Sequence, residues 1–268
     1  MTEASRHDAW QMGDSYDLYM GRWSRQIAPL FLEWLRPGRK LDWLEVGCGT
    51  GALSAAILAG CDPRSLIGID PSEGFLNKAR ANVKDPRAGF RVGDAQALSL
   101  PSGTMDIVVS GLMVNFVPDR QKALQEMARV ARAGATLAFY VWDYPGGGMG
   151  FMRAFWTAAG ALDPAARELS EDRRFPFCTR DQLADLARQS GWADVEAGEV
   201  EVPTRFKNFE DFWRPFTLGA GPAPGYCVSL PAEQRQRLKE KLEADLRYES
   251  DGSVAFRAKA WTIRGRAI

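Results

Sequence analysis

The chain of 268 residues contains a single histidine, His7, and four cysteines, no two of which form a CxxC pair. A structural zinc site is built from closely spaced cysteine and histidine ligands, so no metal site is expected. A disulfide framework is not expected either, because a chain of this length can build a core without cross-links.

The chain also lacks an excess of charge and a long apolar run. Its 34 basic residues balance its 34 acidic residues, whereas a generic nucleic-acid-binding protein carries a basic face. No uninterrupted apolar run approaches the roughly 18 residues of a membrane span. The polar N-terminus lacks the apolar segment of a signal peptide. We therefore expect a cytoplasmic protein without nucleic-acid or membrane partners, and the sequence does not indicate an oligomeric state.

The chain does have a regular alternation of short apolar segments and amphipathic helices. Strands are predicted at residues 41–46, 66–69, 89–92, 105–110 and 135–142, with two more near 194–203 and 258–264. Thr50 is expected to cap the helix after the first strand, and Pro71 to begin the next helix. Continuous apolar strands that alternate with helices predict an α/β fold with a parallel sheet covered on both faces.

Two segments interrupt this alternation. Residues 145–176 open with three glycines and continue into an aromatic helix, and residues 204–253 carry an aromatic stripe followed by a charged helix. We interpret both as insertions that form a cap for a substrate. The whole chain, 1–268, is then expected to be one domain, with an N-terminal helical arm or lid at 1–36 and a cofactor-binding core at 40–143.

Three glycines follow the first strand and precede a helix, at Gly47, Gly49 and Gly51. A glycine turn in this position lets a ligand approach main-chain amides at the helix N-terminus, where a Cβ would block it. The spacing from Gly47 to Ala52 also satisfies the dinucleotide-binding pattern. A tight turn without a ligand is the simpler alternative.

Three acidic residues narrow the choice of ligand. Glu45 would repel a pyrophosphate but suits a cationic sulfonium and an ammonium group. Asp70, at the end of the second strand, can accept hydrogen bonds from ribose hydroxyls, or it can simply cap a helix. Asp94, at the end of the third strand, can accept from an adenine amino group beside the Ala95 N–H, or it can be a solvated turn residue.

These segments resemble the class I S-adenosylmethionine-dependent methyltransferases, in particular those of quinone and natural-product pathways. The matching pieces are EVGCGTG from Glu45, GIDPS from Gly68 and GDAQALSLPSGTMDIVVS from Gly93. The resemblance implies a Rossmann-like sheet of seven mostly parallel strands in the order 3-2-1-4-5-7-6, with strand seven antiparallel and helices on both faces. It also implies the cofactor S-adenosylmethionine and the product S-adenosylhomocysteine. The residues that it assigns to the cofactor are Glu45, Gly47, Gly49, Gly51, Asp70, Pro71, Ser72, Asp94, Ala95 and Ser110.

Further candidates lie outside these motifs. Tyr16 and Tyr19 could face the sulfonium through cation–π attraction, and Arg22 could pair with the cofactor carboxylate; packing of an N-terminal arm is the alternative. The candidates for binding the acceptor come from the N-terminal arm, the segment after the fourth strand and the end of the fifth strand. They are Trp23, Asn115, Trp142 and Tyr144.

The function predicted from these residues is methyl transfer to a small, apolar or aromatic acceptor by in-line displacement. Such a reaction needs orientation more than a protein nucleophile, and no catalytic base is named. Transfer to oxygen or carbon is favoured, and nitrogen stays open. The alternatives are a non-catalytic module that binds S-adenosylmethionine and an NAD-dependent oxidoreductase.

Overall fold

The computed structural model describes residues 17–268, so the single histidine His7 and the candidate Tyr16 lie outside the described residues. These residues form two compact units. The sheet unit comprises residues 24–142, 177–200 and 260–268, and the described part of the helical unit comprises residues 17–23, 143–176 and 201–259. Within residues 17–268, no helix combines the length and the apolar character that crossing a bilayer requires.

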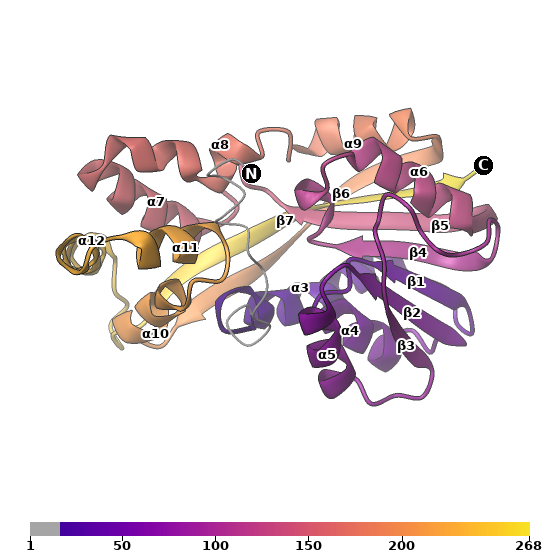
Figure 1. Cartoon of the computed structure of the whole chain (residues 1–268), viewed down its shortest axis with the longest axis horizontal. Helices are drawn as coiled ribbons and strands as arrows, with labels where there is room; N and C mark the ends of the chain where they lie inside the picture. The colour runs from indigo at the N-terminus through magenta and orange to yellow at the C-terminus, as the bar shows by residue number, and fades with distance from the viewer. Residues whose placement is uncertain (1–16) are drawn as a thin grey trace. The chain divides into compact units, whose positions relative to one another are not determined.

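A seven-stranded sheet runs in the order β3-β2-β1-β4-β5-β7-β6, which confirms the expected order (Figure 1). The neighbours from β3 to β5 pair in parallel, and β7 is antiparallel to β5. The strands are β1 (Asp42–Val46), β2 (Ser65–Asp70), β3 (Ala88–Val92), β4 (Met105–Gly111), β5 (Ala131–Trp142), β6 (Trp192–Phe206) and β7 (Val254–Ala267).

Helices cover both faces of this sheet. Successive side chains of a strand point to opposite faces, so Phe139 and Tyr140 of β5 mark the two sides. Tyr140 packs on Phe31 with ring centroids 4.6 Å apart, whereas Phe139 packs edge-on against Trp192, whose indole N–H donates to the carbonyl of Leu124. Phe31 belongs to α3 (Arg22–Leu35) on one face, and Leu124 belongs to α6 (Arg120–Val130) on the other. The remaining helical elements of the sheet unit are α4 (Ala52–Gly60), α5 (Glu73–Asn82), η2 (Val114–Phe116) and α9 (Arg180–Gln189).

Two predicted helix starts are wrong by one or two residues. The N-cap of α4 is Gly51 in a left-handed conformation, not Thr50, because the glycine turn continues to its last glycine before the helix begins. Helix α5 begins at Glu73 instead of Pro71, because the Ser72 hydroxyl accepts from the Phe75 N–H and so caps the helix.

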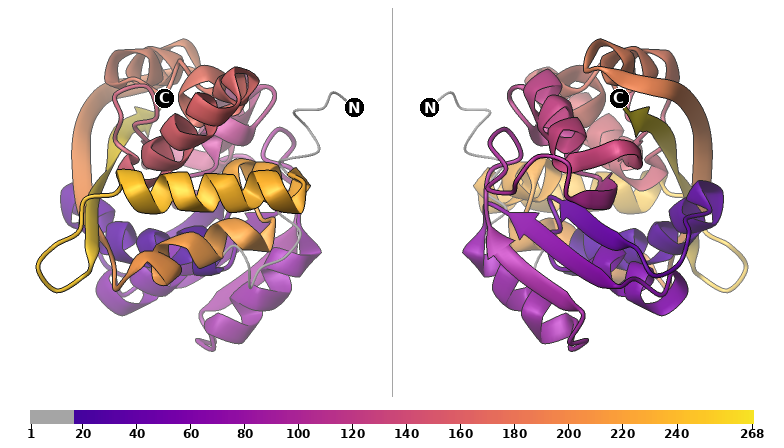
Figure 2. Two further views of the ribbon diagram at one scale, coloured as in Figure 1. Left: turned by 90° about the vertical axis from the view of Figure 1, so that its left-hand side faces the viewer. Right: turned by 90° about the vertical axis from the view of Figure 1, so that its right-hand side faces the viewer.

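The helical unit has an aromatic core. The residues of the predicted stripe, Phe206, Phe209, Phe212, Trp213 and Phe216, are all buried. Phe216 stacks on Phe155 with centroids 4.4 Å apart, and α12 packs against α7 (Figure 2). The helical elements of this unit are η1 (Asp17–Gly21), α7 (Gly150–Leu162), η3 (Pro164–Leu169), α8 (Glu171–Arg174), α10 (Phe209–Trp213), η4 (Arg214–Leu218), α11 (Pro222–Ser229) and α12 (Ala232–Asp245). That this unit caps a substrate remains a prediction.

An ion pair on α6, between buried Glu126 and half-buried Arg129, holds the segment between β3 and β4. The Glu126 carboxylate accepts from the Leu98 N–H at 2.8 Å and from Arg129, and the Arg129 guanidinium donates in turn to the carbonyls of Leu98 and Leu100. Hydrogen bonds from Arg129 lower the pKa of Glu126, with the Leu98 N–H acting in the same direction against desolvation. A loop without regular structure is therefore fixed by charge-assisted hydrogen bonds.

We expect Glu126→Gln to lower the free energy of unfolding by about 1 kcal/mol at neutral pH, because the amide keeps the shape but loses the charge. The folded-state pKa is depressed, so this stabilisation is present above the unfolded pKa and is lost as the pH falls through the folded value. Urea denaturation of both proteins at neutral and acidic pH measures the difference. Glu33→Gln, at an exposed position of α3, is the control; an equal effect at both positions, or a difference independent of pH, would contradict the assignment.

Candidate functional site

The glycine turn follows β1 and is fastened to the end of β2. The N–H groups of Gly47 and Cys48 both donate to the Ile69 carbonyl, at 2.7 and 3.0 Å. Gly47, Gly49 and Gly51 all have positive φ, at 75°, 52° and 88°, a region that glycine adopts without penalty. The backbone angles alone therefore favour glycines in this turn, whether or not a ligand binds there.

Gly47 and Gly49 differ in what surrounds them. A Cβ at position 47 would lie 2.3 Å from the Cγ of Met113, so this glycine also makes room for the segment after β4. A Cβ at position 49 would meet no atom within 4 Å. The open space above Gly49 is where a ligand could approach the main chain.

Asp70 joins three of the predicted motifs. Its carboxylate accepts from the Gly49 N–H at 3.0 Å and from the Ser72 N–H at 2.9 Å, and its carbonyl accepts from the Gly93 N–H at 3.2 Å. The side chain is buried, and this burial raises the pKa of Asp70 while the two N–H donors lower it. The structure thus brings the glycine turn, the Asp70–Ser72 segment with its exposed Pro71, and the start of the Gly93-Asp94-Ala95 segment to one edge of the sheet.

Asp94 is exposed and already has partners. One of its carboxylate oxygens accepts from the Gln96 N–H at 2.8 Å, and the Gln96 amide donates to both oxygens. Ala95 is half-buried beside it. The role of Asp94 and Ala95 at an adenine edge stays a prediction.

Glu45 is a buried carboxylate that forms no ion pair with the residues the structure describes. It is 2 % exposed, and it accepts a hydrogen bond from the hydroxyl of Ser54, in the first turn of α4. Burial raises the pKa of Glu45 to about 8; the Ser54 hydrogen bond opposes this rise, and the charge of Asp70 adds to it. A carboxyl group in this state would gain from a cationic partner such as an ammonium group, because the pair would compensate the cost of burying its charge.

The end of β4 and the segment after it hold buried polar side chains without partners among residues 17–268. Ser110 is fully buried and Asn115 is 2 % exposed, yet no described residue forms a hydrogen bond with the Ser110 hydroxyl or the Asn115 amide. Leu112 between them has φ 60°, which is strained for a residue with a branched side chain. Unsatisfied buried polar groups next to backbone strain are typical of a binding site.

The remaining candidates are packed into the core. Trp142, at the end of β5, is 2 % exposed. In the helical unit, Tyr19 packs edge-on against Phe151 and Phe216, and Trp23 packs against Phe151 and Phe206. Burial raises the pKa of Tyr19 well above its ordinary value, and the charge of Glu171 adds to this rise, so its hydroxyl, which has no partner among residues 17–268, is a donor at neutral pH.

Arg22 and Tyr144 have partners within the helical unit. Arg22 forms an ion pair with Asp211 at 3.0 Å, and its guanidinium lies 4.3 Å from the ring centroids of Trp23 and Phe206. Tyr144 packs on Phe175 with centroids 5.4 Å apart. Their roles toward cofactor and acceptor stay predictions.

Several residues of this site were not singled out from the sequence. Ser54 lies nine residues after Glu45, and neither the spacing nor the residue type indicates the pair. Met113 and Leu112 belong to an apolar segment that periodicity cannot separate from core. Among the described residues, no group of three or more histidine, cysteine or acidic side chains could hold a metal ion.

Comparisons with known proteins agree with this geometry. The family described as "Methyltransferase domain" matches residues 44–139. A demethylmenaquinone methyltransferase of Roseiflexus sp. is 31% identical over 167 residues, which cover 59% of this chain and 69% of the relative. A malonyl-[acyl-carrier protein] O-methyltransferase of Geobacter sulfurreducens is 28% identical, over 74% of this chain and 72% of the relative.

A structure of phosphoethanolamine N-methyltransferase 2 from Haemonchus contortus, solved with S-adenosyl-L-methionine, superposes with a TM-score of 0.61. It is 15% identical, and the match covers all of this chain and 60% of that one. The chain therefore belongs to the class I S-adenosylmethionine-dependent methyltransferases. S-adenosylmethionine is the cofactor of this family.

The residues at the sheet edge suit this cofactor chemically. Glu45 offers a buried carboxylate with no cationic partner among the described residues, Asp70 offers a carboxylate for hydroxyl groups, and Gly49 has open space above it. The sequence motifs already singled out Glu45, Gly49 and Asp70, and the contacts described above give a physical reason for each of the three.

We expect Gly49→Ala to weaken the binding of S-adenosylhomocysteine at least about tenfold while costing only about 1 kcal/mol in stability, because the added methyl meets the ligand and not the protein. Gly103→Ala is the matched control, since Gly103 also has positive φ and open surroundings but lies in the loop before β4. Titration calorimetry and thermal melting separate the two effects. Equal affinities in the two variants would show that no ligand approaches Gly49.

We also expect binding of S-adenosylhomocysteine near pH 7 to release close to one proton. With a pKa of about 8, Glu45 is mostly protonated in the free protein, and the ammonium group of the ligand would favour its ionised form. Affinity should therefore rise as the pH is raised toward 8. Calorimetry in buffers of different ionisation enthalpy measures the release, and Glu45→Gln should abolish it.

The raised pKa of Glu45 also affects the stability of the free protein. The folded-state pKa of Glu45 lies above its unfolded value, so the free protein should lose stability as the pH rises between the two values, and Glu45→Gln should not. In the binding experiment described above, identical proton release by the wild-type protein and by Glu45→Gln would rule out Glu45 as the partner of the ammonium group.

Proposed function

We propose that this chain transfers the methyl group of S-adenosylmethionine to a small acceptor. The observation that carries the proposal is the connection made by Asp70, whose carboxylate and carbonyl tie the glycine turn and Gly93 to the end of β2. Membership of the methyltransferase family supports the reaction type. The two curated relatives are named for different acceptors, so the acceptor is a further proposal.

The proposed reaction asks mainly for orientation. When bound, the cofactor supplies a methyl group on a positively charged sulfur, which is already activated for displacement. This chain's contribution would be to hold the cofactor through Glu45, Asp70 and the main chain at Gly49, and to exclude water around the acceptor. The acceptor loses one proton for each methyl group that it gains.

No residue is proposed as the base that receives this proton. Within the helical unit, the Asp143 carboxylate is held by Lys259 at 2.9 Å and by the Gly146 N–H at 2.9 Å. Tyr19 stays protonated because its pKa is raised. An acceptor with an acidic hydroxyl or an activated carbon needs little assistance in losing the proton, which favours transfer to oxygen or carbon.

We propose that the residues of the helical unit contribute to acceptor binding and that the acceptor is apolar or aromatic. The aromatic content of residues 145–176 and 204–253 supports this assignment. A relative named for a quinone-type acceptor supports a ring-bearing compound.

We expect S-adenosylmethionine and S-adenosylhomocysteine, but not NAD, to raise the melting temperature, since a ligand at about 100 times its Kd adds about 2.7 kcal/mol. Asp70→Asn should weaken the binding of S-adenosylmethionine and S-adenosylhomocysteine about 10- to 100-fold, because a main-chain N–H or a ligand hydroxyl then loses a charged acceptor. Asp181→Asn, at an exposed position of α9, is the control.

Methyl transfer itself is tested with labelled S-adenosylmethionine and a panel of phenols, quinols and carboxylic acids. Acceptor-dependent formation of S-adenosylhomocysteine is the expected result. Tight binding of the sulfur ligands without transfer to any acceptor would favour the non-catalytic module, and a shift with NAD alone would favour the oxidoreductase.

A further inference from the structure

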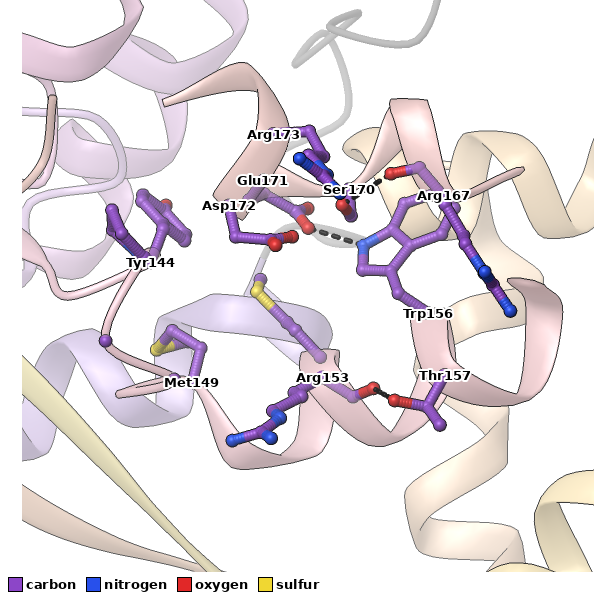
Figure 3. A pocket seen from close by; sticks show the side chains of 14 residues that line it. Tyr144, Met149, Arg153, Trp156, Thr157, Arg167, Ser170, Glu171, Asp172 and Arg173 are labelled. Carbon is purple, nitrogen blue, oxygen red and sulfur yellow. Dashed lines mark hydrogen bonds between the residues drawn. The ribbon is translucent and has the colours of Figure 1, made fainter. Parts of the chain in front are cut away.

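The helical unit contains a cavity of about 500 Å³ with an apolar wall. Tyr144, Met149, Met152 and Trp156 line it, with the indole of Trp156 facing its interior (Figure 3). Flat aromatic and thioether side chains favour a planar apolar ligand. The volume lies within the range of small-molecule sites.

A buried carboxylate with one free oxygen reaches this cavity. Glu171 is 3 % exposed, and one of its oxygens accepts from the indole N–H of Trp156. The other oxygen, Oε1, is buried, and no donor among residues 17–268 forms a hydrogen bond with it. Burial raises the pKa of Glu171 to about 7. A buried carboxylate oxygen without a donor is costly, and a ligand with a hydroxyl group would remove this cost.

The charge around the cavity is positive. Arg153, Arg167 and Arg173 line it, against the single exposed carboxylate of Asp172. Among residues 17–268, none of these three guanidinium groups forms an ion pair. They would attract an anionic group and repel an ammonium ion. A guanidinium group also matches the geometry of a carboxylate.

We propose that this cavity of the helical unit binds a flat hydroxylated carboxylic acid. Its hydroxyl group donates to the free oxygen of Glu171, its ring packs on Trp156, and its carboxylate lies among the arginines. The inference does not depend on the proposed function, because the cavity and its charges belong to the helical unit alone.

The test uses three naphthalene compounds that differ by one group each. The probe is 6-hydroxy-2-naphthoate; 2-naphthoate lacks the hydroxyl, and 2-naphthol lacks the carboxylate. Calorimetry at neutral pH should show the probe binding at least about tenfold more tightly than either, because each lost group removes a charge-assisted hydrogen bond. A cationic probe, 2-(aminomethyl)naphthalene, should bind more weakly than all three.

Two sets of variants assign the contacts. Glu171→Gln keeps an acceptor for Trp156 and should abolish the preference for the probe over 2-naphthoate. The triple variant Arg153→Gln, Arg167→Gln and Arg173→Gln should abolish the preference over 2-naphthol. A control with the same change in charge replaces three exposed arginines outside this cavity, Arg214, Arg237 and Arg247, by glutamine and should alter neither preference.

Binding of S-adenosylhomocysteine to the same preparations keeps the two proposals separate and checks that each variant is folded. If S-adenosylhomocysteine binds but the probe does not, or if all the naphthalenes bind alike, the cavity assignment fails and the methyltransferase proposal stands. Tighter binding of the amine would overturn the charge argument. If the probe binds as expected but S-adenosylhomocysteine does not bind, the cavity stands as a ligand site and the proposed function fails.

Discussion

The hydrogen bond from the Gly49 N–H to the Asp70 carboxylate is the contact on which the candidate cofactor site depends. Three residues of the glycine turn lack side chains, and their positive φ angles make the turn expensive to order. Asp70 compensates by accepting from Gly49 and Ser72 at once, while its own carbonyl holds Gly93. One residue therefore orders three loops that the chain separates by more than forty positions.

Carboxylates in this protein fall into two groups by their surroundings. Hydrogen bonds from arginines lower the pKa values of Glu126 and Asp85, and in Asp106 the Asp42 N–H and then Arg132 lower it. Among residues 17–268, no arginine donates a hydrogen bond to Glu45 or Glu171; each accepts from a neutral side chain, and burial raises the pKa of each. The first group fastens loops and strands. The second group is desolvated without full compensation, which a fold tolerates mainly where a ligand completes the pairing.

The sequence supported the fold further than it supported the site. Apolar segments located the strands of the sheet, but their spatial order came from the family motifs, because periodicity does not say which strands are neighbours. Helix starts at Thr50 and Pro71 were misjudged by one or two residues, since the choice between adjacent capping residues depends on backbone angles. The glycine turn, Asp70 and Gly93 could be brought together in advance because the carboxyl ends of parallel strands meet at one edge.

Contacts made by side chains of irregular segments were harder to predict from the sequence. Ser54, Met113 and Gln96 contact predicted residues through geometry that no spacing rule encodes. The same holds for Trp156 and Glu171, which lie on different helices joined by a short 3-10 segment. A cofactor held largely by main-chain groups imposes glycines and strand-end acids, and so leaves a pattern in the sequence. An acceptor held by side chains imposes only a local balance of charge and shape, which becomes visible once the chain has folded.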